Sequence, residues 1–165
     1  MDALRKVPDN IPNSEILSEN LEKPLSDIPD PYNKFSSFAD HNNNLLKEFL
    51  DQFGFEYEFA SATDYYKNGN FDETLSKILE NYEAIINIIL PTIGEERKKT
   101  YSPFLPICPD TGQVLLAKVL DYNTKEKSIL YEHPNTQEEK ETSILGGKCK
   151  LQWKADWAMR WVALD

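Results

Sequence analysis

The stretch "GGKCKLQWKADWAMRWVALD" at residues 146–165 contains all three tryptophans of the chain and connects two kinds of structure. Its first half, with two glycines and alternating residues, is typical of a short strand. Its second half spaces Trp153, Trp157 and Trp161 four residues apart, which predicts a helix beginning near Lys154. This stretch thus joins a strand to a helix, and over 40–60 a helix joined to a strand by one glycine indicates an α/β unit.

The tryptophan row allows two interpretations. A stripe of large aromatic side chains on one helix face is most often part of a core, and the residues alone favour this interpretation. Asp156 and Arg160, however, form an i,i+4 pair beside the row, and ion pairs are seldom buried without a purpose. A carboxylate between aromatic walls is also suited to bind a cationic side chain.

The residues before this stretch contain short β-like runs. Four of them follow one another from residue 103 onward, "FLPIC", "VLLAKVLDY", "KSILYEH" and "ETSILGGKCKLQW". They are separated by the turn-forming sequences "PDTG", "NTKE" and "HPNTQ". This pattern predicts a small antiparallel β meander over 103–150.

A helical pattern precedes the meander. In "FDETLSKILENYEAIINIIL" (71–90) apolar residues recur every three or four positions, which predicts one long helix. Pro91 should end it. "TIGE" (92–95) matches a capping box that would restart one turn through "ERKK" (96–99).

Residues 40–69 predict a helix, a strand and a short helix. The helix should span 40–53, with Asp40 as its N-cap and Gly54 as its stop. Alternating aromatic and acidic residues over 55–60 predict a strand, and "SATD" (61–64) matches a capping box that opens a short helix.

The N-terminal residues 1–39 contain five prolines and few periodic apolar positions. We expect an extended, loop-rich arm rather than a folded unit.

Composition limits the classes of function. The chain has 165 residues, 40% hydrophobic and 28% charged, which is typical of one soluble domain. It has no apolar run long enough for a membrane span and no secretory signal, so we expect a cytoplasmic protein without a membrane partner. A net charge of −10 argues against a dedicated nucleic-acid-binding module, DNA included, although local basic clusters at 96–99 and 148–150 leave phosphate contacts open in the second part of the chain.

Metal and nucleophile motifs are weak. "CPDTG" resembles a zinc knuckle whose second cysteine is Thr111, and the remaining candidate ligands are Cys108, Asp110, His133 and Cys149. Because metal ligands normally come in close pairs, we expect no zinc, and two cysteines that remain half-buried thiols. No nucleophile motif or phosphate-binding loop is present, so no catalytic residue is assigned.

Polar and basic residues at helix ends offer further candidates. "DHNNN" around His41 could face a ligand, but capping of the helix is the favoured interpretation. Arg97, Lys98 and Lys99 could contact phosphates or simply complement the C-terminal end of a helix dipole.

Three stretches, at 23–75, 90–112 and 146–161, resemble the class I lysyl-tRNA synthetases of the bacterial branch over nearly the whole chain. They include "FADHNNNLLKEFLDQFGFEYEFASATDYY", "LPTIGEERKKTYSPFLPICPDTG" and "GGKCKLQWKADWAMRW". That family builds a Rossmann core with two ATP signatures, a histidine-glycine motif and a lysine-serine motif. Neither occurs in this chain, which therefore resembles an internal fragment between them.

The resemblance implies an organisation in four parts. Residues 1–39 would be an arm, 40–102 the helical and αβ part of the Rossmann catalytic domain, 103–150 the inserted antiparallel meander and 151–165 a return helix into the core. The paired-cysteine knuckle of the family is reduced here to Cys108, which makes zinc unlikely for this chain.

The resemblance also implies a function and its residues. The full-length protein would use ATP with Mg²⁺ to join lysine to tRNA(Lys), and the fragment alone would be inactive. The lysine-pocket candidates are Trp153, Asp156, Trp157 and Arg160. Candidate contacts to tRNA phosphates are Arg97, Lys98, Lys99, Lys148 and Lys150. The alternative is an autonomous RNA- or protein-binding module with a tryptophan-rich core.

Overall fold

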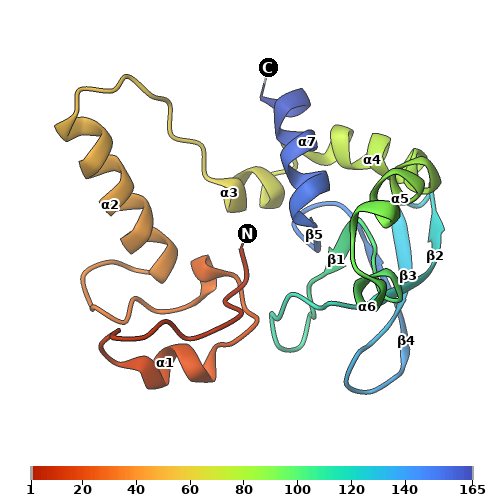
Figure 1. The fold of residues 1–165 in the computed structure, drawn as a ribbon, viewed down its shortest axis with the longest axis horizontal. Coiled ribbons are helices and arrows are strands. Elements are labelled where there is room, and N and C mark those ends of the chain that lie inside the picture. Colours follow the sequence, from red (N-terminus) through yellow and green to blue (C-terminus); the bar gives the residue numbers. More distant parts are fainter. Residues whose placement is uncertain (1, 165) are drawn as a thin grey trace. The chain divides into compact units, whose positions relative to one another are not determined.

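The computed structural model describes residues 2–164, and it divides into two compact units, one up to Thr63 and one from Asp64 onward. Figure 1 shows the first unit in red to yellow and the second in yellow-green to blue. Each unit is described by itself.

The first unit has a small core of its own. It contains α1 (Ser14–Glu19), a 3₁₀ turn η1 (Leu25–Asp27) and α2 (Phe38–Gln52). Its buried apolar residues come from the N-terminal segment, α1, the loop after η1 and the first residue of α2: Leu4, Leu17, Ile28 and Phe38. The predicted extended arm over 1–39 is therefore partly folded, because its few apolar side chains converge on the start of α2.

Helix α2 begins two residues earlier than its pattern predicted. Its N-cap is Ser37, whose side chain accepts a hydrogen bond from the backbone N–H of Asp40 at 3.1 Å, so the predicted capping role of Asp40 was wrong. The helix ends before Gly54, which has a positive φ of 70°. Apolar side chains along α2 are more than half exposed: Leu45, Leu46, Phe49 and Phe53.

The strand predicted over 55–60 is absent. This segment has no regular secondary structure in the described chain, and Phe55, Tyr57 and Phe59 are each at least 40% exposed. A strand needs a hydrogen-bonded neighbour, and none of the described strands pairs with this segment.

Five short helical elements follow. α3 (Ala62–Lys67) confirms the short helix predicted after "SATD". The helix predicted over 71–90 is instead two, α4 (Asp72–Glu80) and α5 (Tyr82–Ile89), and η2 (Leu90–Thr92) and α6 (Glu95–Lys98) complete the series.

Asn81 separates α4 from α5. Its backbone has φ −106° and ψ 22°, and its side-chain amide donates to the carbonyl oxygen of Lys77 at 2.9 Å. Asparagine is a poor helix former because its side chain competes for such backbone groups. Apolar periodicity continued through this position, and for that reason the break was not predicted.

The one-turn restart after Pro91 is present as α6, but its predicted capping box is not. Gly94 is the N-cap, and no side chain caps the helix. Thr92 instead donates its hydroxyl to the carbonyl oxygen of Ile89 at 2.7 Å, in the preceding helix.

The β-like runs form two small antiparallel sheets. β2 (Lys118–Asn123), β3 (Ser128–Glu132) and β4 (Glu139–Ser143) make a three-stranded meander with a bulge between Val119 and Asp121. β1 (Phe104–Pro106) pairs separately with β5 (Cys149–Leu151). The antiparallel prediction is confirmed, as one meander plus one pair rather than a single sheet.

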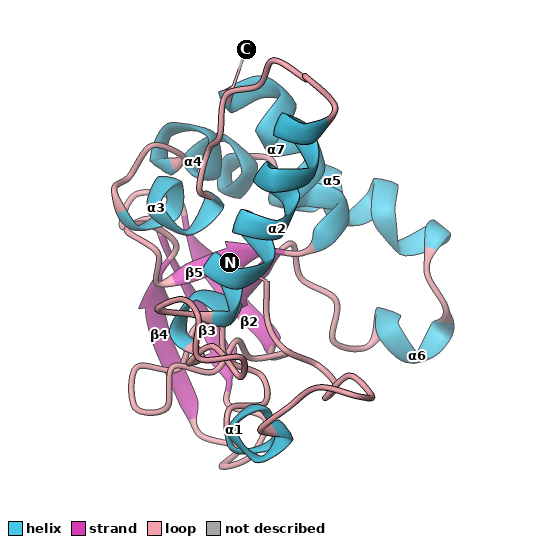
Figure 2. Ribbon diagram, turned by 90° about the vertical axis from the view of Figure 1, so that its left-hand side faces the viewer, coloured by secondary structure: helices cyan, strands magenta, loops and turns pink. Residues whose placement is uncertain are grey.

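The core beside the meander contains Cys108, Leu115, Ala117 and Tyr131. Both cysteines are free thiols, and they are fully buried rather than half-buried as predicted. Figure 2 shows the strands of this unit below α3, α4 and α7 (Trp153–Ala163).

Candidate functional site

Helix α7 is positioned by the β1–β5 pair. Leu151 of β5 is opposite Phe104 of β1, and the backbone N–H of Gln152 donates to the carbonyl oxygen of Pro103 at 2.8 Å. The helix then begins at Trp153, one residue before the predicted start. The sheet thus fixes where the last helix leaves the strand.

A buried polar cluster fixes how α7 is rotated. The hydroxyl of Tyr66, in α3, donates to Asp156 Oδ1 at 2.6 Å and accepts from the backbone N–H of Leu151 at 3.1 Å. Arg160 donates from Nε and Nη2 to Asp156 Oδ2, both at 2.7 Å. The cluster joins α3, β5 and α7 through one carboxylate.

Burial makes these bonds strong. Tyr66 is fully buried and Asp156 is 7% exposed, so both lose most of their hydration. Burial, and then the charge of Asp156, raise the pKa of Tyr66 far above its ordinary value. Tyr66 therefore keeps its proton and remains a donor to the carboxylate.

The tryptophan row does not form a core. Trp153, Trp157 and Trp161 are 72%, 52% and 74% exposed, so the interpretation that the residues alone favoured was wrong among the residues described. The buried face of α7 is instead made by Ala155, Asp156 and Met159. The four-residue spacing correctly predicted a helix, but the buried face of that helix is the one opposite to the tryptophans.

The four predicted pocket residues lie on one helix, with different surroundings. Trp153 and Trp157 present their rings to solvent, whereas Asp156 is occupied by Tyr66 and Arg160. Sequence reasoning missed Tyr66, because it lies ninety positions from Asp156 and only the fold brings them together. Its one visible signal was a tyrosine pair in a short helix.

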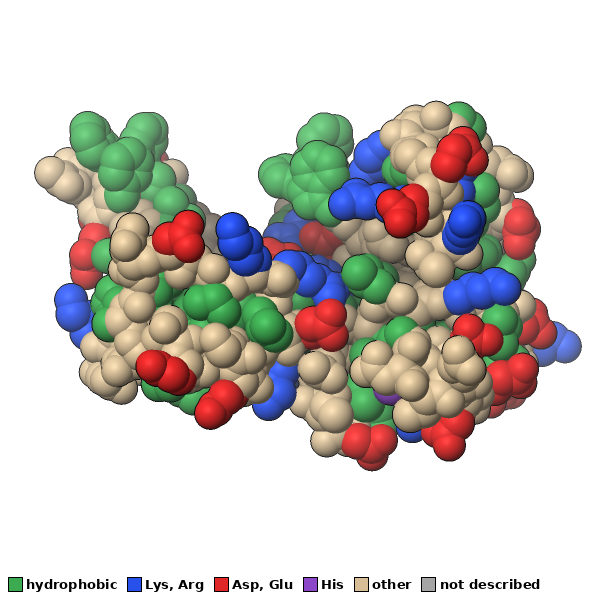
Figure 3. Space-filling model, turned by 60° about the horizontal axis from the view of Figure 1, so that its bottom comes forward, with side chains coloured by type: hydrophobic (Ala, Val, Ile, Leu, Met, Phe, Trp, Pro, Cys, Tyr) green, Lys and Arg blue, Asp and Glu red, His purple; other side chains and the backbone are tan. Residues whose placement is uncertain are grey.

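The predicted phosphate contacts lie on two elements. Arg97 and Lys98 are in α6, which Lys99 follows, whereas Lys150 is in β5 and Lys148 precedes it. α6 and β5 lie apart in both ribbon views (Figures 1 and 2), and Lys98 is paired with Glu95 at 2.5 Å. On the face drawn in Figure 3, basic and acidic side chains are interspersed rather than gathered in a basic stripe.

His41 is a buried structural residue of the first unit. Its Nδ1 lies 3.1 Å from Asp30 Oδ2, and its ring stacks on Tyr32. Backbone N–H groups of Tyr32, Lys34 and Phe35 also donate to Asp30. The histidine thus completes a loop-stabilising cluster at the start of α2; its role is structural, but it does not cap the helix, whose N-cap is Ser37.

The remnant of the zinc knuckle brings Cys108 into hydrogen-bonding contact with Thr111 and His133. Burial raises the pKa of Cys108, but hydrogen bonds from Thr111, His133 and two backbone N–H groups lower it to about 7 overall. Burial alone raises the pKa of Cys149. Across residues 2–164, no three His, Cys, Asp or Glu side chains gather as metal ligands.

None of the described helices is long and apolar enough to cross a membrane.

Comparison with known proteins covers the whole chain. The family described as "tRNA synthetases class I (K)" matches residues 1–165. The chain is 51% identical over 164 residues to a lysine–tRNA ligase of Rickettsia bellii (strain OSU 85-389), covering 99% of this chain and 31% of that relative. The lysine–tRNA ligase of Rickettsia felis is 49% identical over 99% of this chain and 31% of that relative. The lysine–tRNA ligase of Rickettsia typhi is 47% identical over 100% of this chain and 31% of that relative.

The chain thus spans about a third of the length of these curated relatives. The family match extends over every residue, and the relatives align from one end of the chain to the other. The chain belongs to the class I lysine family of tRNA synthetases.

Proposed function

We propose that this chain is one part of a cytoplasmic lysine–tRNA ligase, which joins lysine to ATP as an adenylate and transfers it to tRNA(Lys). The observation that supports this most strongly is the alignment of lysine–tRNA ligases with the entire chain at about half identity. The alternative of an autonomous module with a tryptophan core is disfavoured, because the tryptophans are exposed.

Within the full-length ligase, we assign residues 40–102 and α7 to the Rossmann-type catalytic domain and the two small sheets to its insertion. Only antiparallel pairing occurs among the described strands, so the parallel strands of that domain would come from the rest of the protein. The arm over 1–39 would pack at the start of α2, against the apolar core described above.

The lysine pocket is proposed at the exposed side of α7. Trp153 and Trp157 supply aromatic faces that attract an ammonium group by cation–π interaction. Asp156 and Arg160 act as positioning residues, since the carboxylate is already bonded to Tyr66 and to the guanidinium. They hold the helix so that the rings face the substrate.

We expect the described residues to contribute less to the binding of tRNA and ATP than to the binding of lysine. The proposed phosphate contacts are Arg97, Lys98, Lys99, Lys148 and Lys150. Such binding should be weakened by the net charge of −10, and it should depend steeply on salt because each neutralised phosphate releases counterions. ATP and its Mg²⁺ would be held by other parts of the protein, and we assign no magnesium ligand to the described residues.

The test uses the full-length ligase and lysine-dependent ATP–pyrophosphate exchange. Trp157→Ala should raise the KM for lysine about tenfold, since a cation–π contact contributes about 1–2 kcal/mol. Trp161→Ala is the control, because it removes another exposed ring of the same row, 74% exposed against 52% for Trp157, that is not assigned to the pocket. Equal KM values for lysine in the two variants would refute the assignment of the lysine pocket to α7. Absence of lysine-dependent exchange in the wild-type ligase would refute the proposed function.

A further inference from the structure

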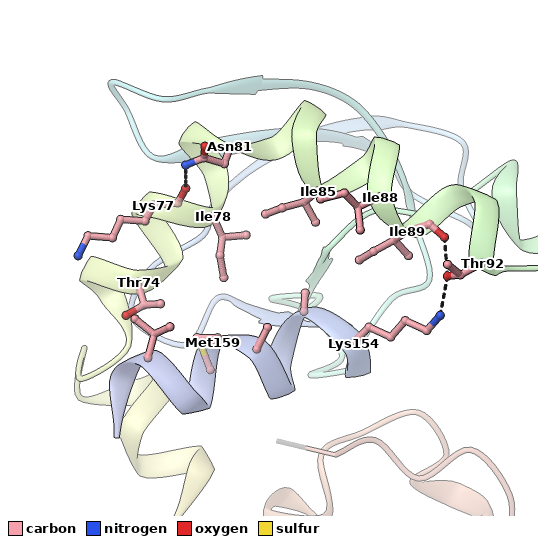
Figure 4. A pocket seen from close by; sticks show the side chains of 13 residues that line it. Thr74, Lys77, Ile78, Asn81, Ile85, Ile88, Ile89, Thr92, Lys154 and Met159 are labelled. Atoms are coloured by element: carbon pink, nitrogen blue, oxygen red, sulfur yellow. Dashed lines mark hydrogen bonds between the residues drawn. The ribbon is translucent and has the colours of Figure 1, made fainter. Parts of the chain in front are cut away.

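An apolar groove runs between the α4–α5 pair and α7. Its volume is about 590 Å³, and Figure 4 shows Ile78, Ile85 and Ile88 pointing from α4 and α5 toward α7. Met159 and Val162 contribute from the α7 side. Ile88 is 71% exposed and Val162 is 66% exposed, so the apolar walls remain open to solvent.

The groove adjoins the tryptophan row. With 3.6 residues per helical turn, positions 154, 158 and 162 lie beside positions 153, 157 and 161. Positions 154, 158 and 162 line the groove, and the other three are the exposed tryptophans. The two features therefore form one continuous apolar surface, of a kind that monomeric proteins rarely leave uncovered.

The polar residues of the groove do not favour a small molecule. Clefts for small ligands use a few convergent polar groups to orient them. Here Asn81 donates to a backbone carbonyl, and Thr92 donates to Ile89 while its hydroxyl accepts from Lys154 Nζ at 2.6 Å. What remains is an apolar floor with Lys154 at one end and Lys77, whose ammonium is paired with Glu73 at 2.7 Å, at the other.

We propose that this groove is the docking site for an amphipathic helix from the part of the ligase outside residues 1–165. The curated relatives are about three times as long as this chain, so most of the full-length protein is available to cover it. Helices bind such grooves through apolar residues spaced three or four apart. Lys154, whose ammonium donates to the neutral hydroxyl of Thr92, favours a helix with a carboxylate near one end.

This inference rests on the proposed function only in taking the full-length ligase as the source of the helix. The test is maleimide labelling of full-length Ile88→Cys, compared with full-length Lys125→Cys, whose position is exposed in the β2–β3 turn. Cys108 and Cys149 are buried, so these two cysteines contribute little background labelling. In the folded ligase Ile88→Cys should react at least tenfold more slowly than Lys125→Cys, and the two should react equally in denaturant.

The occupant is identified by zero-length carbodiimide coupling of lysines to carboxylates. Lys154 should couple to an Asp or Glu outside residues 1–165 of the same molecule, whereas Lys77 should couple to Glu73, its partner at 2.7 Å. Equal labelling of the two variants in the folded protein overturns the proposal, as does coupling only between copies or only within residues 1–165. Lysine-dependent ATP–pyrophosphate exchange is measured on the same protein samples. Slow maleimide labelling of Ile88→Cys without ATP–pyrophosphate exchange refutes the proposed function alone. Exchange activity without slow labelling refutes the proposed docking alone.

Discussion

The hydroxyl of Tyr66 provides a sharp test of how α7 is held. Tyr66→Phe removes one hydrogen bond to the charged Asp156 and leaves the buried N–H of Leu151 without its partner. A bond to a charged group contributes about 1.5–3 kcal/mol, and an unsatisfied buried donor costs about 1–3 kcal/mol. Allowing for overlap between the two effects, we expect a loss of about 3 kcal/mol in the free energy of unfolding.

The chain contains a matched control. Tyr101 also has a buried hydroxyl, and burial raises its pKa to about 12, but this hydroxyl has no hydrogen-bond partner among the residues that the structure describes. Tyr101→Phe makes the same chemical change without breaking a bond. It should be neutral or slightly stabilising, because an unpaired buried hydroxyl is removed.

Urea unfolding followed by far-ultraviolet circular dichroism measures both variants. Tryptophan fluorescence is less informative here, because the three tryptophans are already exposed. With a denaturant slope of about 2 kcal/mol per molar urea, a loss of 3 kcal/mol lowers the midpoint by about 1.5 M. A double-mutant cycle with Asp156→Asn should show coupling. If Tyr66→Phe lowers the midpoint no further than Tyr101→Phe, the cluster does not hold α7.

Three further expectations concern pH and backbone geometry. Burial raises the pKa of Asp30, but the hydrogen bonds that this carboxylate accepts lower the pKa to about 2 overall, below its ordinary value. The stability that the carboxylate contributes should therefore be lost as pH falls from about 4 to about 2. Asp30→Asn should lack this loss in an acid titration. Thiolate absorbance near 240 nm should show Cys108 titrating near pH 7 while Cys149 stays protonated, and a single titration well above pH 8 would contradict this. Elemental analysis should find no stoichiometric zinc. Gly147→Ala should destabilise the chain more than Gly146→Ala. Both positions have a positive φ, but only a Cβ added at 147 would meet another residue, the side chain of Lys67 in α3, at 3.0 Å. Equal melting temperatures of the two variants would contradict this.

Local signals predicted the positions of most elements. The helix patterns located α2, α3, α6 and α7 within about two residues, and the turn sequences located the strands of the meander. These features depend on residues near in sequence: a cap, a glycine stop or a hairpin turn. Asn81 shows the limit of this reasoning, since one side-chain bond to Lys77 ended a helix whose apolar periodicity was unbroken.

Distant contacts could not be read from the pattern. The pairing of Asp156 with Arg160 was visible as an i,i+4 spacing, but Tyr66 joins them from ninety residues away. Likewise, the alternation over 55–60 met the local requirement for a strand and lacked the hydrogen-bonded neighbour that a strand needs. In both cases the deciding group lies elsewhere in the chain or outside it.

The apolar patterns whose faces proved exposed have a common physical meaning. An amphipathic stripe indicates that a helix face is removed from water, but it does not identify what covers that face. The stripe of α2 and the tryptophan row of α7 are both regular, and both are exposed in a chain that spans about a third of its relatives' length. Exposed apolar area of this extent is stabilised when it is covered, by roughly 25 cal/mol for each Å² removed from water. We therefore expect the rest of the ligase to pack on the exposed stripe of α2 and on the part of the tryptophan row outside the proposed lysine pocket.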